Sequence, residues 1–146
     1  MATIAYGAEK VVRDTPESFG NFQAGQSSRT PGQIVAHLGD LFDWALSLAK
    51  GQQAWHDSQP LPWQDEVKRF FESLKRFDDY LAGDGVLHAS PDKLLQGPAA
   101  DALKHVGQIA MLRRLAGIPI KAENYFVADI AAGQVGPKQP PARMEL

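Results

Sequence analysis

The feature that most constrains the fold of this chain is an apolar repeat with the period of an α-helix. Five apolar residues recur at alternating steps of four and three positions: Ile34, Leu38, Leu41, Ala45 and Leu48. Thr30 can cap a helix that contains this repeat, Pro31 suits its first position, and Gln33 completes a capping box. Gly51 after Lys50 is a typical C-terminal stop. The sequence therefore predicts a helix over this segment, with one buried stripe.

Three other segments also have the apolar spacing of helices. They run from about Thr3 to Arg13, from about Pro62 to Leu81 and from about Pro98 to Ala116, and Gly117 and Pro119 end the last one. That last segment has a wide apolar arc that we expect to be buried: Leu103, Val106, Ile109, Ala110, Leu112 and Leu115. No segment shows the sustained alternation of a strand. The predicted fold class is therefore all-α, a four-helix bundle.

The chain is expected to form one domain over residues 1–146, with the bundle at about 3–117 and a C-terminal extension at 118–146. Phe19 and Phe22 lie in a Gly-rich connection after the first helix. We expect these two aromatic side chains to plug one end of the core.

The C-terminal extension is expected to contain one short helix, from Glu123 to Ala131. Phe126 and Ile130 would be its buried anchors, and the segment would cover the open end of the bundle. The alternative is that it folds back and brings Tyr125 or Asn124 to a site in the bundle. The segment from Gly136 to Pro141 contains three prolines and is predicted to be an extended tail.

The absence of cysteine limits the chemistry of any site. It excludes disulfides, thiolate ligands and a cysteine nucleophile, so a metal would need His, Asp, Glu or water. The 15 basic and 17 acidic residues give a net charge of -2, which provides no reason to expect a nucleic acid partner. The N-terminus lacks the pattern of a signal peptide, and no apolar run approaches the ~20 residues of a membrane span. We therefore expect a cytoplasmic protein with a small-molecule substrate.

Two histidines lie within predicted helices, near the faces that point inward. Asp101 stands four residues before His105, so the two side chains share one side of their helix. If the second and fourth helices pack side by side, His37 can meet this pair. Two imidazoles and a carboxylate suit Zn, Ni, Fe or Mn, and three protein ligands leave positions open for water or substrate.

Each of these residues also has a purely structural interpretation. A histidine beside an apolar stripe is more often a hydrogen-bonded core residue, and a carboxylate such as Asp101 in the first turn of a helix is favoured by the helix dipole. His56 and His88 lie in predicted connections. Solvated loop residues are the simplest interpretation of both, with a role as an extra ligand as the alternative.

Two further features have competing interpretations. Asp40, one turn beyond His37, is a candidate partner for that imidazole, but an exposed helix position is the interpretation we favour. Three tryptophans are candidates for a pocket mouth near the metal: Trp44, Trp55 and Trp63. We favour core or dimer-interface anchors for these tryptophans.

Two segments resemble helices of the DinB/YfiT-like family of small helical bundles that carry a divalent metal. The segment from Thr30 to Trp44 resembles the second helix of that family, in which a histidine after an Ile-Val-Ala type of run supplies the first metal ligand; here that histidine is His37. The segment from Asp101 to Gly117 resembles the last bundle helix, which carries His-x-x-x-His. His105 matches the second histidine, and this chain has an aspartate in place of the first.

The resemblance covers about residues 1–117 and implies a down-up-up-down bundle with a long crossover between the second and third helices. The connection from Gly51 to Leu61 has 11 residues. It can span roughly 35 Å when extended, against about 30 Å for a 20-residue helix, so the crossover is feasible. The metal ligands implied by the resemblance are His37, Asp101 and His105.

The function implied by the resemblance is that of an enzyme dependent on divalent Zn, Ni, Fe or Mn. Relatives include transferases in which the metal activates a low-molecular-weight thiol, and also isomerases and hydrolases. A homodimer is also expected, because bundles of this family often pair through their helices. The alternative is a metal-free module that binds a small ligand or acts in a stress response, with Asp101 and His105 as a helical polar pair.

Overall fold

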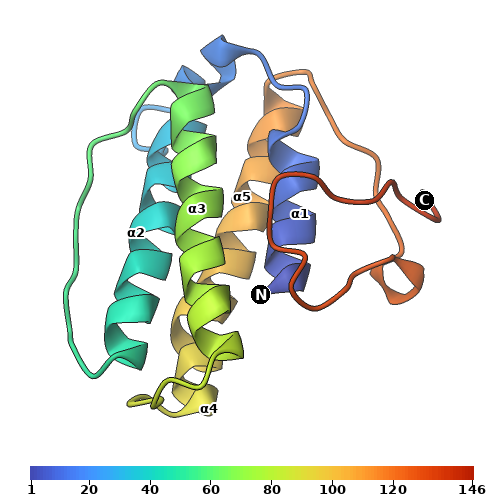
Figure 1. Ribbon diagram of the computed structural model, residues 1–146. Coiled ribbons are helices and arrows are strands. Elements are labelled where there is room, and N and C mark those ends of the chain that lie inside the picture. The colour runs from blue at the N-terminus through green and yellow to red at the C-terminus, as the bar shows by residue number, and fades with distance from the viewer.

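The computed structural model describes residues 1–146 and is helical throughout its core (Figure 1). Four long helices form the bundle: α1 (Ala2–Val12), α2 (Pro31–Ala49), α3 (Trp63–Ala82) and α5 (Ala100–Leu115). The shorter helical elements are η1 (Glu17–Asn21), α4 (Pro91–Leu94), η2 (Leu95–Ala99) and η3 (Tyr125–Val127). The chain forms no strand, so the predicted all-α class is confirmed. None of the helices is both long and apolar enough to cross a membrane.

The start of α2 follows from its first residues. The Oγ1 of Thr30 accepts a hydrogen bond from the backbone N–H of Gln33 at 3.2 Å, and the Thr30 N–H donates to the Gln33 side chain at 2.9 Å. The predicted capping box is therefore confirmed. Gly51 follows the helix with a φ of 77°, a conformation that favours glycine. These two ends fix which residues of α2 face the core.

The directions of the helices bring α2 and α5 together. In Figure 1, α2 and α3 run the same way, α1 and α5 run the opposite way, and the segment between α2 and α3 passes along the outside of the bundle. The largest helix contacts are α2 with α3 and α1 with α5, and α2 also packs against α5. Side chains from α2 and α5 can therefore meet at one place.

The core is rich in aromatic side chains, which bury large areas and hold α2, α3 and η1 together. Phe42 of α2 lies 6.0 Å from Phe70 and 6.1 Å from Phe77 between ring centres. Phe19 of η1 is buried and packs edge-on against Trp63 at 5.4 Å, and Phe22 is partly buried beside it. Each such burial contributes about 1.5–3 kcal/mol. The predicted role of Phe19 and Phe22 in the core is confirmed.

The helical segment that leads into the fourth bundle helix is longer than predicted. Ser90 caps α4, and the backbone remains helical through the π-turn η2 into α5, whereas the sequence predicted a start near Pro98. Proline has no N–H to donate one turn back, and the wider π-turn accommodates it. Asp101 therefore does not lie in the first turn of an isolated helix, which weakens the dipole explanation for its position.

The apolar arc of α5 is narrower than predicted. Ile109 is fully buried, and Val106 and Leu112 are also part of the core. Leu103 and Leu115 are exposed, which contradicts the prediction for these two residues. Among the long helices, α1 and α2 make the main contacts with α5, and these contacts leave the outer face of α5 exposed at both leucines.

The predicted helix from Glu123 to Ala131 is wrong. Only the single turn η3 forms there, because the Asn124 side chain accepts a hydrogen bond from the N–H of Phe126 at 3.0 Å and favours a local turn. Phe126 is 96% exposed, so it is not the predicted anchor. Ile130 is only partly buried.

Other residues hold the extension, which lies against α1 in Figure 1. Tyr6 of α1 donates a hydrogen bond to the Glu123 carboxylate and packs edge-on against Tyr125 at 5.5 Å. Lys10 of α1 donates to the carbonyl of Pro140 at 2.9 Å, and Val135 is buried. The extension thus covers the side of α1, and residues 136–141 form no helix or strand, in agreement with the predicted tail.

A buried ion-pair network ties the crossover to α2 and α3. Arg69 donates to Asp40 at 2.9 Å, to Glu66 at 2.6 Å and to the carbonyl of Ala36 at 2.7 Å. Asp40 also accepts from the N–H of Ser58 at 2.8 Å and from its hydroxyl at 2.7 Å. The network therefore links three segments: α2, α3 and the crossover between them.

Asp40 is 2% exposed, which contradicts the exposed position that the sequence favoured. Burial acts to raise the pKa of the Asp40 carboxyl, but the hydrogen bonds from Ser58 and Arg69 outweigh it and hold the pKa below its ordinary value. Gly39 lets the guanidinium approach, because a Cβ there would lie 2.9 Å from the Arg69 Cζ. Asp40 contacts Arg69 and Ser58 rather than His37, so its proposed pairing with that imidazole is also wrong.

Candidate metal centre

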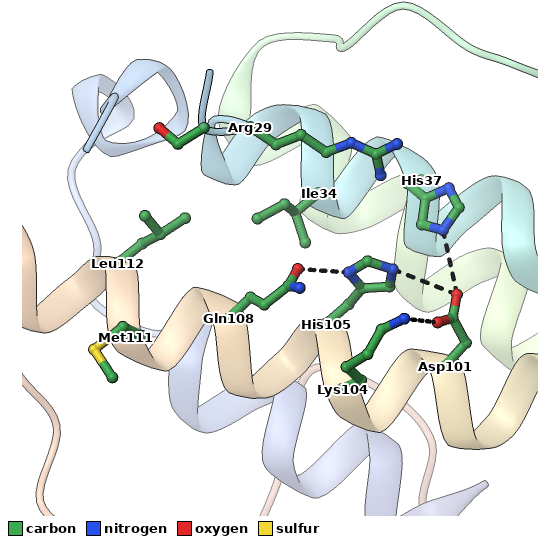
Figure 2. Close-up of a pocket in the computed structure, with 10 residues that line it drawn as sticks. Arg29, Ile34, His37, Asp101, Lys104, His105, Gln108, Met111 and Leu112 are labelled. Atoms are coloured by element: carbon green, nitrogen blue, oxygen red, sulfur yellow. Dashed lines mark hydrogen bonds and ion pairs between the residues drawn. The ribbon is translucent and has the colours of Figure 1, made fainter. Parts of the chain in front are cut away.

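Figure 2 shows where α2 and α5 place the three predicted ligands. His37 projects from α2, and Asp101 and His105 project from successive turns of α5 toward it. The Asp101 Oδ2 lies 3.5 Å from the His37 Nε2 and 3.4 Å from the His105 Nε2. One potential ligand atom from each side chain lies within 4.8 Å of the other two. The structure thus brings together the residues that the sequence singled out.

Asp101 is held so that one of its oxygens faces both imidazoles. The Lys104 ammonium lies 2.5 Å from its other oxygen, Oδ1. Burial acts to raise the pKa of Asp101, but the hydrogen bond from Lys104 and the nearby imidazoles outweigh it and lower the pKa. The group is therefore a carboxylate at neutral pH, which is the form that binds cations.

The orientation of His105 is fixed by Gln108, one turn further along α5. The Nδ1 of His105 lies 2.7 Å from the Gln108 Oε1. An amide oxygen can only accept, so Nδ1 carries the proton and donates it. In the neutral ring this arrangement leaves the lone pair of Nε2 facing Asp101 and His37, which is the usual way a second residue orients a histidine for a metal.

His37 lies at the boundary between the cluster and the crossover. Its ring centre is 4.7 Å from that of His105 and 5.6 Å from that of Trp55, and Trp55 in turn packs against Trp44 at 5.9 Å. Burial is the main cause that lowers the pKa of His37, and the charges of His105 and Arg29 act in the same direction, against the hydrogen bond that His37 donates to Asp101. The neutral imidazole, which is the metal-binding form, is therefore favoured near pH 7.

The cluster opens into a cleft of about 630 Å³ between α2 and α5. The other lining residues are mixed in character: Ser28, Arg29, Ile34, Lys104, Gln108, Met111 and Leu112. A volume of this size is typical of small-molecule sites, which are concave and lined by apolar groups with a few polar ones. A small molecule in this cleft would reach the three candidate ligands directly.

Several residues that the sequence raised take no part in this cluster. His56 and His88 are exposed residues of connections, as expected. Trp63 is buried in the core, which confirms the favoured interpretation for that residue. Trp55, in contrast, is 47% exposed and packs on His37, so it is not a core residue. It is not among the residues that line the cleft, so its place at a pocket mouth stays a prediction.

Sequence reasoning missed the residues that orient the ligands. Lys104 stands three positions after Asp101, and Gln108 stands three positions after His105. This spacing brings side chains together on a helix, so helical geometry could have identified both. Arg29 lies before the start of α2, where no periodic pattern indicates which way its side chain points.

Comparisons with known proteins add no further identification. No protein-family model, curated protein or solved structure matched this chain. The resemblance to the DinB/YfiT-like family therefore stays a prediction, and the functional argument depends on the site.

Proposed function

We propose that His37, Asp101 and His105 bind a divalent metal and that the protein is a metal-dependent enzyme acting on a small molecule. The observation that carries this proposal is the convergence of three ligand atoms from two helices at the end of a cleft. The donor set of two imidazoles and one carboxylate suits Zn, Ni, Fe or Mn. Three protein ligands leave a position free for a substrate or water, as in metal sites that perform catalysis.

The two separations between the carboxylate and the imidazoles fit such an ion. Two ligand atoms bound at ~2.1 Å with a tetrahedral angle between them are about 3.4 Å apart. The carboxylate–imidazole separations here are 3.5 and 3.4 Å. Direct hydrogen bonds between these groups would be shorter, at about 2.7–2.9 Å. Both carboxylate–imidazole contacts are therefore longer than strong charge-assisted hydrogen bonds and have the length expected between two ligands of one ion.

When bound, such a metal supplies Lewis acidity, which polarises a carbonyl or lowers the pKa of a bound water or thiol. The chain itself provides orientation: Gln108 holds His105, and Lys104 holds Asp101. Ile34 and Leu112 provide apolar walls. No separate general base is evident, so we assign no catalytic residue beyond the ligands.

The reaction class follows only from the resemblance, which favours a thiol-dependent transferase or a hydrolase. The homodimer also stays a prediction. Three apolar residues of α5 are exposed and would be suitable for such a contact: Leu103, Met111 eight positions later, and Leu115 four positions after that.

The test is elemental analysis of protein purified without a nickel column. We expect about one ion per chain, as purified or after incubation with Zn, Ni, Fe or Mn followed by gel filtration. A content below about 0.1 ion per chain under all of these conditions would contradict the proposal, because a preformed three-ligand site must retain an ion. It would support the metal-free binding module instead.

A further inference from the structure

One cation in the cleft is not used by the metal centre. Within the cleft the charged residues are Arg29, Lys104 and Asp101, beside the two imidazoles of the centre. Lys104 pairs with Asp101 at 2.5 Å, so these two charges offset each other. Figure 2 shows no ion pair or hydrogen bond from Arg29 to any other residue of the cleft. Arg29 is therefore a free positive charge on the wall of the site.

The position of Arg29 relates it to the metal centre. Figure 2 shows its side chain extended along α2 with the guanidinium on the side of His37. The charge of Arg29 also acts on the His37 imidazole, so the two groups are electrostatically close. Addition of a divalent ion would make this end of the cleft strongly positive. A ligand that fills it needs an anionic group.

The other end of the cleft is apolar. Leu112 and Met111 lie on α5 at the end away from Asp101, and Ile34 of α2 faces them across the cleft (Figure 2). Met111 is largely exposed although it lines this cleft. An apolar group placed here would remove part of this surface from water, at about 25 cal/mol per Å².

We infer that the site takes a small organic anion, with its acidic head between Arg29 and the metal centre and its apolar body along Ile34, Met111 and Leu112. The inference rests on the proposed function, since the head group is placed beside the metal. A guanidinium recognises a carboxylate or another planar oxyanion with two parallel hydrogen bonds, which a neutral group cannot replace. Arg29 thus makes the site selective for ligands with a negative charge, and the apolar wall makes it selective for the length of the ligand's alkyl chain.

The probe is hexanoate, with neutral hexanamide as its uncharged counterpart, titrated by NMR against the protein with and without added Zn²⁺. We expect hexanoate to bind more tightly than hexanamide, and more tightly than butyrate by about fourfold per methylene. Chemical shift changes should centre on the residues of the cleft. The preference for the anion should increase when Zn²⁺ is present, because the ion adds positive charge to the same end.

Arg29→Gln should weaken hexanoate binding about tenfold to a hundredfold and leave hexanamide binding unchanged. Arg29→Lys should weaken hexanoate binding to an intermediate degree, since lysine keeps the positive charge but cannot form the two parallel hydrogen bonds. Arg114→Gln is the matched control: this exposed arginine of α5 lines a different hollow, so its loss should have no effect. Metal content should be the same in all three variants, because neither arginine is a ligand.

The outcomes separate this inference from the proposed function. Equal binding of hexanoate and hexanamide, or an unchanged hexanoate affinity in Arg29→Gln, would overturn the anion site even if the protein holds one metal per chain. Arg29-dependent binding of hexanoate by a protein that takes up no metal would sustain the anion site and refute the metal centre. Loss of anion binding in Arg114→Gln to the same degree as in Arg29→Gln would also overturn the inference.

Discussion

His37→Ala is expected to lose stoichiometric metal binding. His37 is the only candidate ligand from α2, and its removal leaves the Asp101 and His105 pair of a single helix. Loss of a residue that only supports a ligand typically weakens metal affinity 10–100-fold, so loss of the ligand itself should weaken it by more than about a hundredfold. The measurement is competition with a chromophoric chelator for Zn²⁺, together with the metal content after gel filtration.

His56→Ala is the matched control for this variant. His56 is an exposed residue of the crossover and takes no part in the cluster, so its replacement should leave the zinc affinity unchanged. Equal affinities in wild type, His37→Ala and His56→Ala would refute the assignment of the centre. If a catalytic activity is found and survives in His37→Ala, the metal-free binding module becomes the better account.

Arg69→Met is expected to be strongly destabilising. It leaves the carboxylates of Asp40 and Glu66 buried without their shared counter-ion. Removal of one partner from a buried ion pair typically costs about 3–5 kcal/mol. Total stabilities are about 5–15 kcal/mol, so a large share of the fold's stability should be lost. In urea at pH 7 the unfolding midpoint should fall by about 2 M.

Arg76→Met on the same helix is the control. Arg76 pairs with Asp43 at 2.8 Å, but both side chains are in contact with solvent, so its loss should cost less than about 1 kcal/mol. Equal losses of stability in the two variants would contradict the importance that we assign to the buried network.

The pH dependence of the unfolding free energy provides a second check on the network. The pKa of Asp40 in the fold is below its ordinary value, so its contribution to stability is present above about pH 4 and is lost as the pH falls through the lower folded-state pKa. In Arg69→Met the buried carboxyls should instead take up protons readily. The difference in unfolding free energy between wild type and variant should therefore become smaller from pH 7 toward pH 4. A difference that stays constant over this range would contradict the assigned cause.

The parts of the site that the sequence predicted are those determined by local geometry. The capping box at Thr30 fixes the register of α2, and therefore the face on which His37 lies. The spacing of four between Asp101 and His105 places both on one side of α5 whatever else the helix contacts. To bring the three residues together, the site required in addition only that α2 pack beside α5.

The parts that the sequence did not predict depend on distant contacts. Asp40 appeared exposed because its partner Arg69 lies 29 positions away, and no local pattern indicates that pair. Phe126 appeared buried because an aromatic residue has a high average burial, but the turn at Asn124 points it outward. The sequence did not predict that the helical backbone continues through Pro98 into α5, because proline usually marks a helix start.

The central claim is that two imidazoles and one carboxylate from α2 and α5 hold a common ion. Its most direct test is anomalous diffraction at metal absorption edges, from crystals grown without added metal and from crystals soaked in Zn²⁺ or Mn²⁺. We predict one peak at about 2.0–2.2 Å from the Nε2 of His37, the Nε2 of His105 and a carboxylate oxygen of Asp101. No peak among these atoms in either kind of crystal, with the three side chains in direct hydrogen bonds at about 2.8 Å, would contradict the claim.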